Sequence, residues 1–134
     1  MTPDHLIQKA REYIGTPFRF GGRLKHIGVD CGGLILCAVT ELGLSPEAPT
    51  NYTRQTALQT LQETLNQHCQ KVETQQPGDI LLFATKQLPG HCGILTAQNT
   101  FIHAYDSPSV SQVTETPLDA RWQSRVIAVY RIGD

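Results

Sequence analysis

The sequence lacks any excess of charge and any cluster of basic side chains. It contains 11 Lys and Arg residues against 12 Asp and Glu residues, and its formal net charge at pH 7 is −1. Proteins that bind nucleic acid usually present a basic stripe, because phosphate contacts supply much of the affinity. The balance of charge therefore argues against nucleic acid as a partner.

Long apolar runs are missing as well. No stretch of the chain approaches the roughly 20 apolar residues that a membrane-spanning helix needs. The first residues, Met-Thr-Pro-Asp-His, contain neither a basic n-region nor an apolar h-region. The sequence thus predicts no membrane span and no cleavable signal peptide. We expect a protein made in the cytoplasm that stays there or leaves by a route that needs no such signal.

Cysteine is present four times, but without a Cys-x-x-Cys pair. A zinc site built from Cys31, His91, Cys92 and His103 is one alternative, although neighbours such as His91 and Cys92 should point to opposite sides of a strand. Two disulfide bonds are another, although a chain of this length can bury a core without them. We expect no metal.

The length of 134 residues predicts a single domain, residues 1–134. Apolar residues recur with helical spacing over 2–14, 30–42 and 54–68; in the first of these segments they are Leu6, Ile7, Ala10, Tyr13 and Ile14. The pattern then becomes strand-like over 80–84, 91–96, 100–105, 110–114 and 126–132, with turns at 77–79 and 88–90 and a short helix over 117–124. Helices followed by hairpin-linked strands indicate an α+β fold.

Cys31 lies where a glycine-rich loop meets the second predicted helix. The unpaired N–H groups and the dipole at a helix N-terminus favour a thiolate and can bind a developing oxyanion. A cysteine in an apolar helix is otherwise most simply a core residue. The two histidines downstream distinguish these interpretations.

His91 and His103 fall in two strands that a short polar loop connects. If the loop has three residues, 97–99, residue 105 faces 91 and residue 103 faces 93, so the two histidines are diagonal neighbours on one face. A two-residue loop would break this parity. We expect the helix of Cys31 to pack on that same face.

These residues suggest a cysteine hydrolase. Cys31 would be the nucleophile, and His91 the base that takes the thiol proton and later protonates the leaving amine. His103 would hold the tautomer of His91, with Asp106 as a weaker alternative for that role.

Five segments, in this order, resemble the NlpC-type cysteine peptidases, papain-like hydrolases of bacterial cell-wall peptides: residues 13–22, 30–34, 76–80, 91–94 and 101–104. The resemblance implies a papain-like α+β fold, with N-terminal helices, the nucleophile at a helix N-terminus and a C-terminal antiparallel sheet. It implies Cys31, His91 and His103 as the triad, without a cofactor. The expected reaction is hydrolysis of an amide bond in peptidoglycan stem peptides, typically between γ-D-glutamate and the diamino acid.

The resemblance also indicates substrate contacts. Asp30 is a candidate contact as well as a helix N-cap. Phe18, Phe20 and Gly32 stand where the family often has tyrosine, tryptophan and serine, so Phe18 and Gly32 are expected beside the substrate. Without a signal peptide, the chain looks most like members carried by phage or phage-like tail particles or by a secretion system, which would then be its partners. The alternatives are a papain-like amidase or acyltransferase toxin with a substrate outside the wall, and a catalytically idle tail component.

Overall fold

The computed structural model describes residues 1–85 and 90–133. In these residues the helices are α1 (Pro3–Arg11), α2 (Cys31–Glu41), α3 (Ala57–His68) and α4 (Ala120–Gln123). The strands are β1 (Arg23–Leu24), β2 (Gly28–Val29), β3 (Gln70–Val72), β4 (Ile80–Phe83), β5 (His91–Leu95), β6 (Thr100–Asp106), β7 (Ser111–Pro117) and β8 (Val126–Arg131). The expected α+β class is confirmed.

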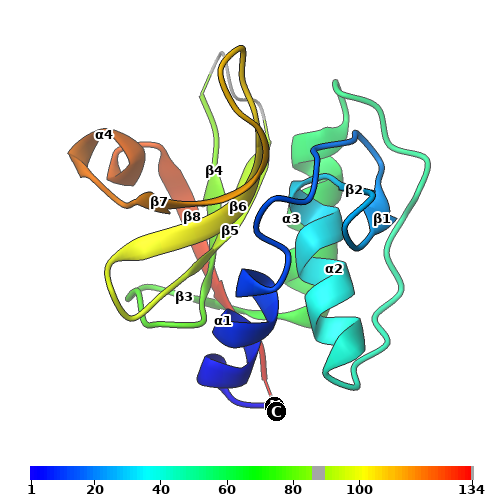
Figure 1. Ribbon diagram of the computed structural model, residues 1–134. Coiled ribbons are helices and arrows are strands. Elements are labelled where there is room, and N and C mark those ends of the chain that lie inside the picture. Colours follow the sequence, from blue (N-terminus) through cyan, green and yellow to red (C-terminus); the bar gives the residue numbers. More distant parts are fainter. Residues whose placement is uncertain (86–89, 134) are drawn as a thin grey trace.

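Six of the strands form one antiparallel sheet in the order β3-β8-β4-β5-β6-β7. Helices α1, α2 and α3 lie on one side of this sheet and α4 lies on the other (Figure 1). The short strands β1 and β2 make a separate pair in the loop before α2.

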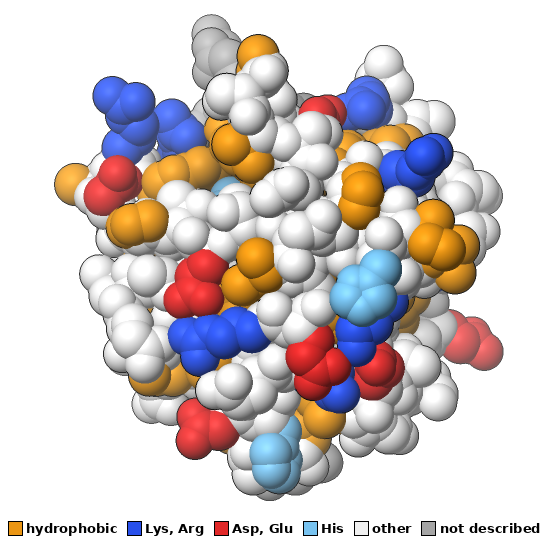
Figure 2. All heavy atoms as spheres, in the orientation of Figure 1, with side chains coloured by type: hydrophobic (Ala, Val, Ile, Leu, Met, Phe, Trp, Pro, Cys, Tyr) orange, Lys and Arg blue, Asp and Glu red, His pale blue; other side chains and the backbone are white. Residues whose placement is uncertain are grey.

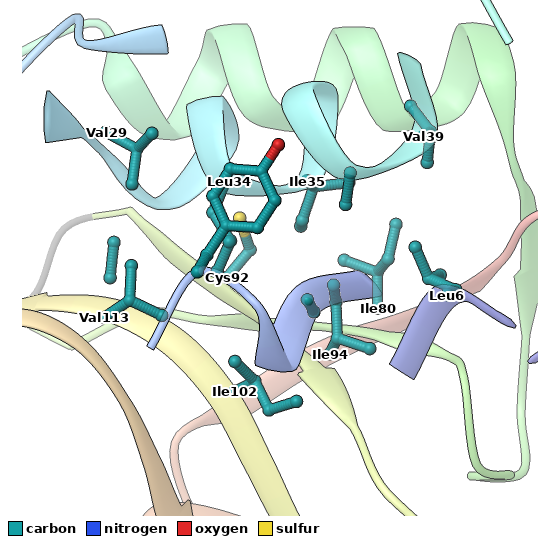
Figure 3. Close-up of a cluster of buried hydrophobic side chains, with 14 of the residues drawn as sticks. Leu6, Val29, Leu34, Ile35, Val39, Ile80, Cys92, Ile94, Ile102 and Val113 are labelled. Atoms are coloured by element: carbon teal, nitrogen blue, oxygen red, sulfur yellow. The ribbon is translucent and has the colours of Figure 1, made fainter. Parts of the chain in front are cut away.

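The sheet separates two apolar clusters, because successive side chains of a strand point to opposite faces. The larger cluster joins the helices to Ile80, Cys92, Ile94 and Ile102 of the sheet. Figure 3 shows these side chains between the sheet and the residues of α2, Leu34, Ile35 and Val39. The smaller cluster covers the other face and includes Phe83, Phe101, Leu118 and Trp122.

Most of the expected elements are present, with different ends. The first helix ends at Arg11 rather than at residue 14, so Ile14 leaves the helical stripe and is 44% exposed instead of buried. Strands β1, β2 and β3 were not expected, because two or three residues carry no readable alternation. The turn predicted at 88–90 falls mainly on residues outside the described ones.

The described surface carries both signs of charge, and the net charge of the chain is −1. On the face in Figure 2, acidic and basic side chains are interspersed. Some of them pair: Lys25 bridges Glu12 and Glu41, with Nζ–O distances of 2.8 and 3.2 Å. In the described residues, no helix is long and apolar enough to cross a membrane.

Candidate active site

Cys31 is the first residue of α2, and the residue before it caps the helix. Asp30 has extended backbone (φ −95°), and its Oδ1 accepts a 2.7 Å hydrogen bond from the N–H of Gly33. A Cβ at Gly33 would lie 2.0 Å from the carbonyl oxygen of Gly22, so only glycine lets the preceding loop approach this turn. The cap leaves the N–H groups of Cys31 and Gly32 without a hydrogen-bond partner in the described residues. The half-buried thiol therefore lies beside free donors at the positive end of the helix dipole.

The two histidines meet on one face of the sheet. Strands β5 and β6 pair Ile94 with Ile102 and Leu95 with Phe101, which is the register predicted for a three-residue loop. Nε2 of His91 lies 2.7 Å from Nδ1 of His103, and both side chains are buried. Glycine at position 93 leaves room for this pair, because a Cβ there would lie 3.2 Å from the Cβ of His103.

A third residue extends this chain of side chains. Nε2 of His103 lies 2.8 Å from Oγ1 of Thr116 on β7. Burial, assisted by the positive charge of His91, lowers the pKa of His103 to about 2, so this ring is neutral. Thr116 was not predicted as a site residue, because the strand predicted from the sequence ended at residue 114. Extending the alternation by two residues would have placed Thr116 on the face of Thr114, which pairs with His103.

The expectation that the helix of Cys31 packs on the face of the histidines is wrong. Helix α2 packs against the opposite face, on Cys92, Ile94 and Ile102. His91 instead contacts the rings of Phe83 and Trp122, on the side of the smaller cluster. The site still assembles because His91 is the first residue of β5, where Cys31 is close enough to both His91 and Cys92 for them to lower the pKa of its thiol.

Cys92 is a second residue whose role beside the thiol was not predicted from the sequence, where it figured only in the alternative zinc site. Hydrogen bonding with Cys92, and then with His91, lowers the pKa of the Cys31 thiol to about 5, against the opposing effects of burial and of the Asp30 charge. The bond to Cys31 and burial raise the pKa of Cys92 well above its ordinary value. Cys92 therefore stays a thiol and can donate its S–H to a Cys31 thiolate.

A cavity of about 730 Å³ opens beside the thiol. Phe18, Asp30, Cys31, Gly32 and His91 all line it, so the predicted substrate-side residues and the thiol share one cavity. Apolar side chains of α2 and α3, including Leu36, Val39 and Leu61, extend its wall. An extended ligand could thus lie against the helices with one bond at Cys31.

The carboxylate of Asp30 is 4% exposed and fully engaged. Besides capping α2, it accepts a 2.8 Å hydrogen bond from the N–H of Gly21 and a hydrogen bond from the hydroxyl of Tyr52. Burial and this bond raise the pKa of Tyr52. Tyr52 lies in a proline-containing loop 22 residues further along the chain, and no sequence pattern links it to Asp30.

The residues that the structure describes contain no group of three His, Cys, Asp or Glu side chains placed to hold a metal ion. A thiol at a helix N-terminus, a histidine that reaches it and a second group that fixes this histidine form the arrangement of cysteine hydrolases.

Comparison with known proteins specifies this class further. The chain belongs to the NlpC/P60 family, whose sequence profile matches residues 15–131. It is 30% identical over 135 residues to a gamma-DL-glutamyl hydrolase of Bacillus subtilis, covering 96% of this chain and 29% of the relative. It is 31% identical over 109 residues to the probable endopeptidase NlpC of Escherichia coli, covering 78% of this chain and 63% of the relative. The chain thus spans less than two thirds of either relative.

Solved structures support the fold. A lipoprotein-like NLP/P60 family protein of Staphylococcus aureus superposes with a TM-score of 0.70 at 24% identity, covering 98% of this chain and 41% of the other. The NlpC/p60 domain of the peptidoglycan hydrolase SagA superposes with a TM-score of 0.66 at 20% identity, covering 98% of this chain and all of the domain. The expected arrangement, N-terminal helices with Cys31 at a helix N-terminus and a C-terminal antiparallel sheet, is therefore confirmed as the fold of NlpC/P60 proteins.

Proposed function

We propose that this protein is a cysteine endopeptidase that hydrolyses an amide bond in peptidoglycan stem peptides, typically the bond between γ-D-glutamate and the diamino acid. The observation that carries the proposal is the continuous contact from Cys31 through His91 to His103 beside a cavity that can hold a peptide. The names of the relatives, an endopeptidase and a γ-glutamyl hydrolase, favour this substrate class.

In the reactive form of the site, the proton of Cys31 has passed to His91, in keeping with the lowered pKa of the thiol. Because Nε2 of His91 faces His103, its Nδ1 is the nitrogen available to the thiol. The thiolate attacks the amide carbon, and the oxyanion accepts hydrogen bonds from the free N–H groups of Cys31 and Gly32. The protonated His91 then gives its proton to the leaving amine, and a thioester remains on Cys31. Water, activated by His91, hydrolyses this thioester and restores the thiol.

His103 and Thr116 keep His91 ready to accept this proton. The assignment that satisfies both contacts has Nε2–H of His103 donating to Thr116 and Nε2–H of His91 donating to Nδ1 of His103. Nδ1 of His91 is then unprotonated, as a base requires. A neutral His103 also accepts a hydrogen bond from the His91 imidazolium during the reaction.

Asp30, Phe18 and Gly32 form the substrate side of the proposal. Phe18 and Gly32 line the cavity next to the thiol. The carboxylate of Asp30 already has three donors, so we assign it to holding Gly21 and the cavity-lining Tyr52 in place, with any substrate contact made alongside these bonds. Delivery by a phage-like particle or a secretion system stays a prediction.

The test is mass spectrometry of purified muropeptides incubated with the wild type and with Cys31→Ala. Cleavage by the wild type alone supports the proposal, and the product masses name the bond. If neither protein cleaves while a thiol reagent still modifies Cys31 rapidly, the enzyme acts on another amide or thioester, as a toxin would. An inert Cys31 without cleavage favours an idle tail component.

The roles of the histidines have a separate test. His91→Ala should remove nearly all activity, because no other group takes the thiol proton. His103→Ala should cost less, because fixing a tautomer is less essential than proton transfer. Equal losses in kcat, with both variants folded by circular dichroism, would contradict these roles.

A further inference from the structure

Two arginines line the cavity that contains Cys31, and their surroundings differ. Arg23 is held by the backbone, because its guanidinium donates to the carbonyl oxygens of Ala48, at 3.3 Å, and of Pro49. Arg54 makes no such bonds. In the parts of the chain that the structure describes, it has neither an ion-pair partner nor a hydrogen-bond acceptor for its side chain.

Arg54 is nevertheless held in place by an aromatic contact. The centre of its guanidinium lies 4.7 Å from the centre of the Phe20 ring. Phe20 in turn meets Tyr52 edge-to-face, with ring centres 5.3 Å apart. Tyr52 donates to Asp30, the residue that precedes the nucleophile. A continuous row of side chains thus connects the arginine to the start of α2.

This arrangement suits an anion. A guanidinium stacked on an aromatic face keeps its N–H edge free, and that edge can bind a carboxylate through two hydrogen bonds. The acidic residues that line the cavity are Asp30 and Asp106. Asp30 is engaged by its three donors, and Asp106 accepts a 3.2 Å hydrogen bond from Ser111 on the neighbouring strand. Neither neutralises Arg54.

We propose that Arg54 binds a free carboxylate of the peptide substrate and so selects substrates that carry one. The proposal rests on the endopeptidase function above and specifies its substrate. A glutamate joined through its γ-carboxyl keeps its α-carboxylate free beside the scissile bond. The C-terminal carboxylate of the peptide is the second possible source of the same chemistry.

The test compares three synthetic γ-D-glutamyl–diamino acid peptides: one with both carboxylates free, one with an α-carboxamide, and one with a C-terminal amide. The wild type and Arg54→Gln are assayed for kcat/KM on each, with Arg121→Gln on α4, which does not line the cavity, as the matched control. Arg54→Lys tests whether charge without the planar fork suffices.

A charge-assisted bidentate contact predicts that the wild type prefers a carboxylate over its amide by about 10- to 100-fold. This preference should disappear in Arg54→Gln, fall partly in Arg54→Lys and persist in Arg121→Gln. The peptide whose amidation removes the effect of Arg54 identifies which carboxylate is bound. An equal loss on all three peptides, or no loss on any, would overturn the proposal.

A failure of the Arg54 carboxylate site can be distinguished from a failure of the proposed endopeptidase function. If the wild type cleaves none of the peptides, the endopeptidase assignment fails on its own. Binding of the same peptides to Cys31→Ala and to Cys31→Ala/Arg54→Gln, measured by calorimetry, then decides the role of Arg54. Binding to Cys31→Ala that does not distinguish carboxylate from amide would overturn the arginine site as well.

Discussion

Replacing Cys92 should make the nucleophile less acidic. Cys92 is 1% exposed on β5, and its hydrogen bond is the largest influence that lowers the pKa of Cys31 to about 5. Because the pKa of Cys92 itself is raised, it keeps the proton that it donates. Cys92→Val and Cys92→Ala both remove this donor, one with a slightly larger side chain and one with a smaller.

The size of the effect follows from the strength of the bond. A hydrogen bond to a charged group contributes about 1.5–3 kcal/mol, and S–H is a weak donor, so the lower end applies. Each pKa unit corresponds to about 1.4 kcal/mol, so the pKa of Cys31 should rise by about one unit. At pH 5 the thiolate fraction would fall from about one half to about one tenth.

Site-resolved alkylation measures this directly. The rate at which iodoacetamide modifies the Cys31 peptide, followed by mass spectrometry across pH 4–9, gives the pKa of the thiol. Cys37→Ala is the control, because Cys37 lies on the same helix but donates to the carbonyl oxygen of Arg23, at 3.2 Å. A midpoint in both Cys92 variants that matches the wild type would refute the reasoning.

Two further predictions concern the histidine chain. Thr116→Val should lower kcat by about 5- to 10-fold with little change in KM, because it removes one hydrogen bond of about 1 kcal/mol that fixes His103. Thr116→Ser keeps the hydroxyl and should retain kcat. Unchanged kinetics in Thr116→Val would contradict the tautomer assignment. His103 has its pKa lowered from 6.5 to about 2 in the folded protein, so between these values the unfolded chain binds a proton that the folded protein does not. The free energy of unfolding should therefore fall by about 1.4 kcal/mol for each pH unit below 6.5. Urea unfolding at pH 7 and 4.5 should show this decrease in the wild type. In His103→Asn, the decrease in the free energy of unfolding between the two pH values should be smaller by about 2–3 kcal/mol. An equal decrease in both proteins would argue against a buried neutral ring.

The pairing of the two histidine strands could be predicted from the sequence, because it depends only on whether the loop between them has an odd or an even number of residues. With a three-residue loop, alternation alone brings His91 and His103 together, and the structure has that register. The positive φ of Asn99, 58°, ends this loop in a conformation that asparagine tolerates. Local chemistry and strand periodicity point to the same arrangement here.

Contacts between distant segments could not be predicted in this way. Tyr52 lies in an irregular loop and donates a hydrogen bond to Asp30. Arg54, two residues further along, stacks on the ring of Phe20. No periodicity relates these positions, because the path of a loop depends on the surfaces over which it packs. The face on which α2 packs could not be predicted either. Both faces of the sheet carry apolar clusters, so a helix could have packed on either one.

The misassigned face explains why Cys92 was overlooked. Alternation says that His91 and Cys92 point apart, and in the sheet they do: one joins the cluster of Phe83 and Trp122, the other the cluster beneath α2. Because successive side chains of a strand point to opposite faces, two neighbouring residues cannot share a contact that lies directly above one face. They can share a contact that lies beside the end of the strand. Cys31 lies near the start of β5, where the strand begins, and there the first residue supplies a base while the second supplies a thiol donor. A nucleophile that lies beside the end of a strand can therefore be activated by residues from both faces of one sheet.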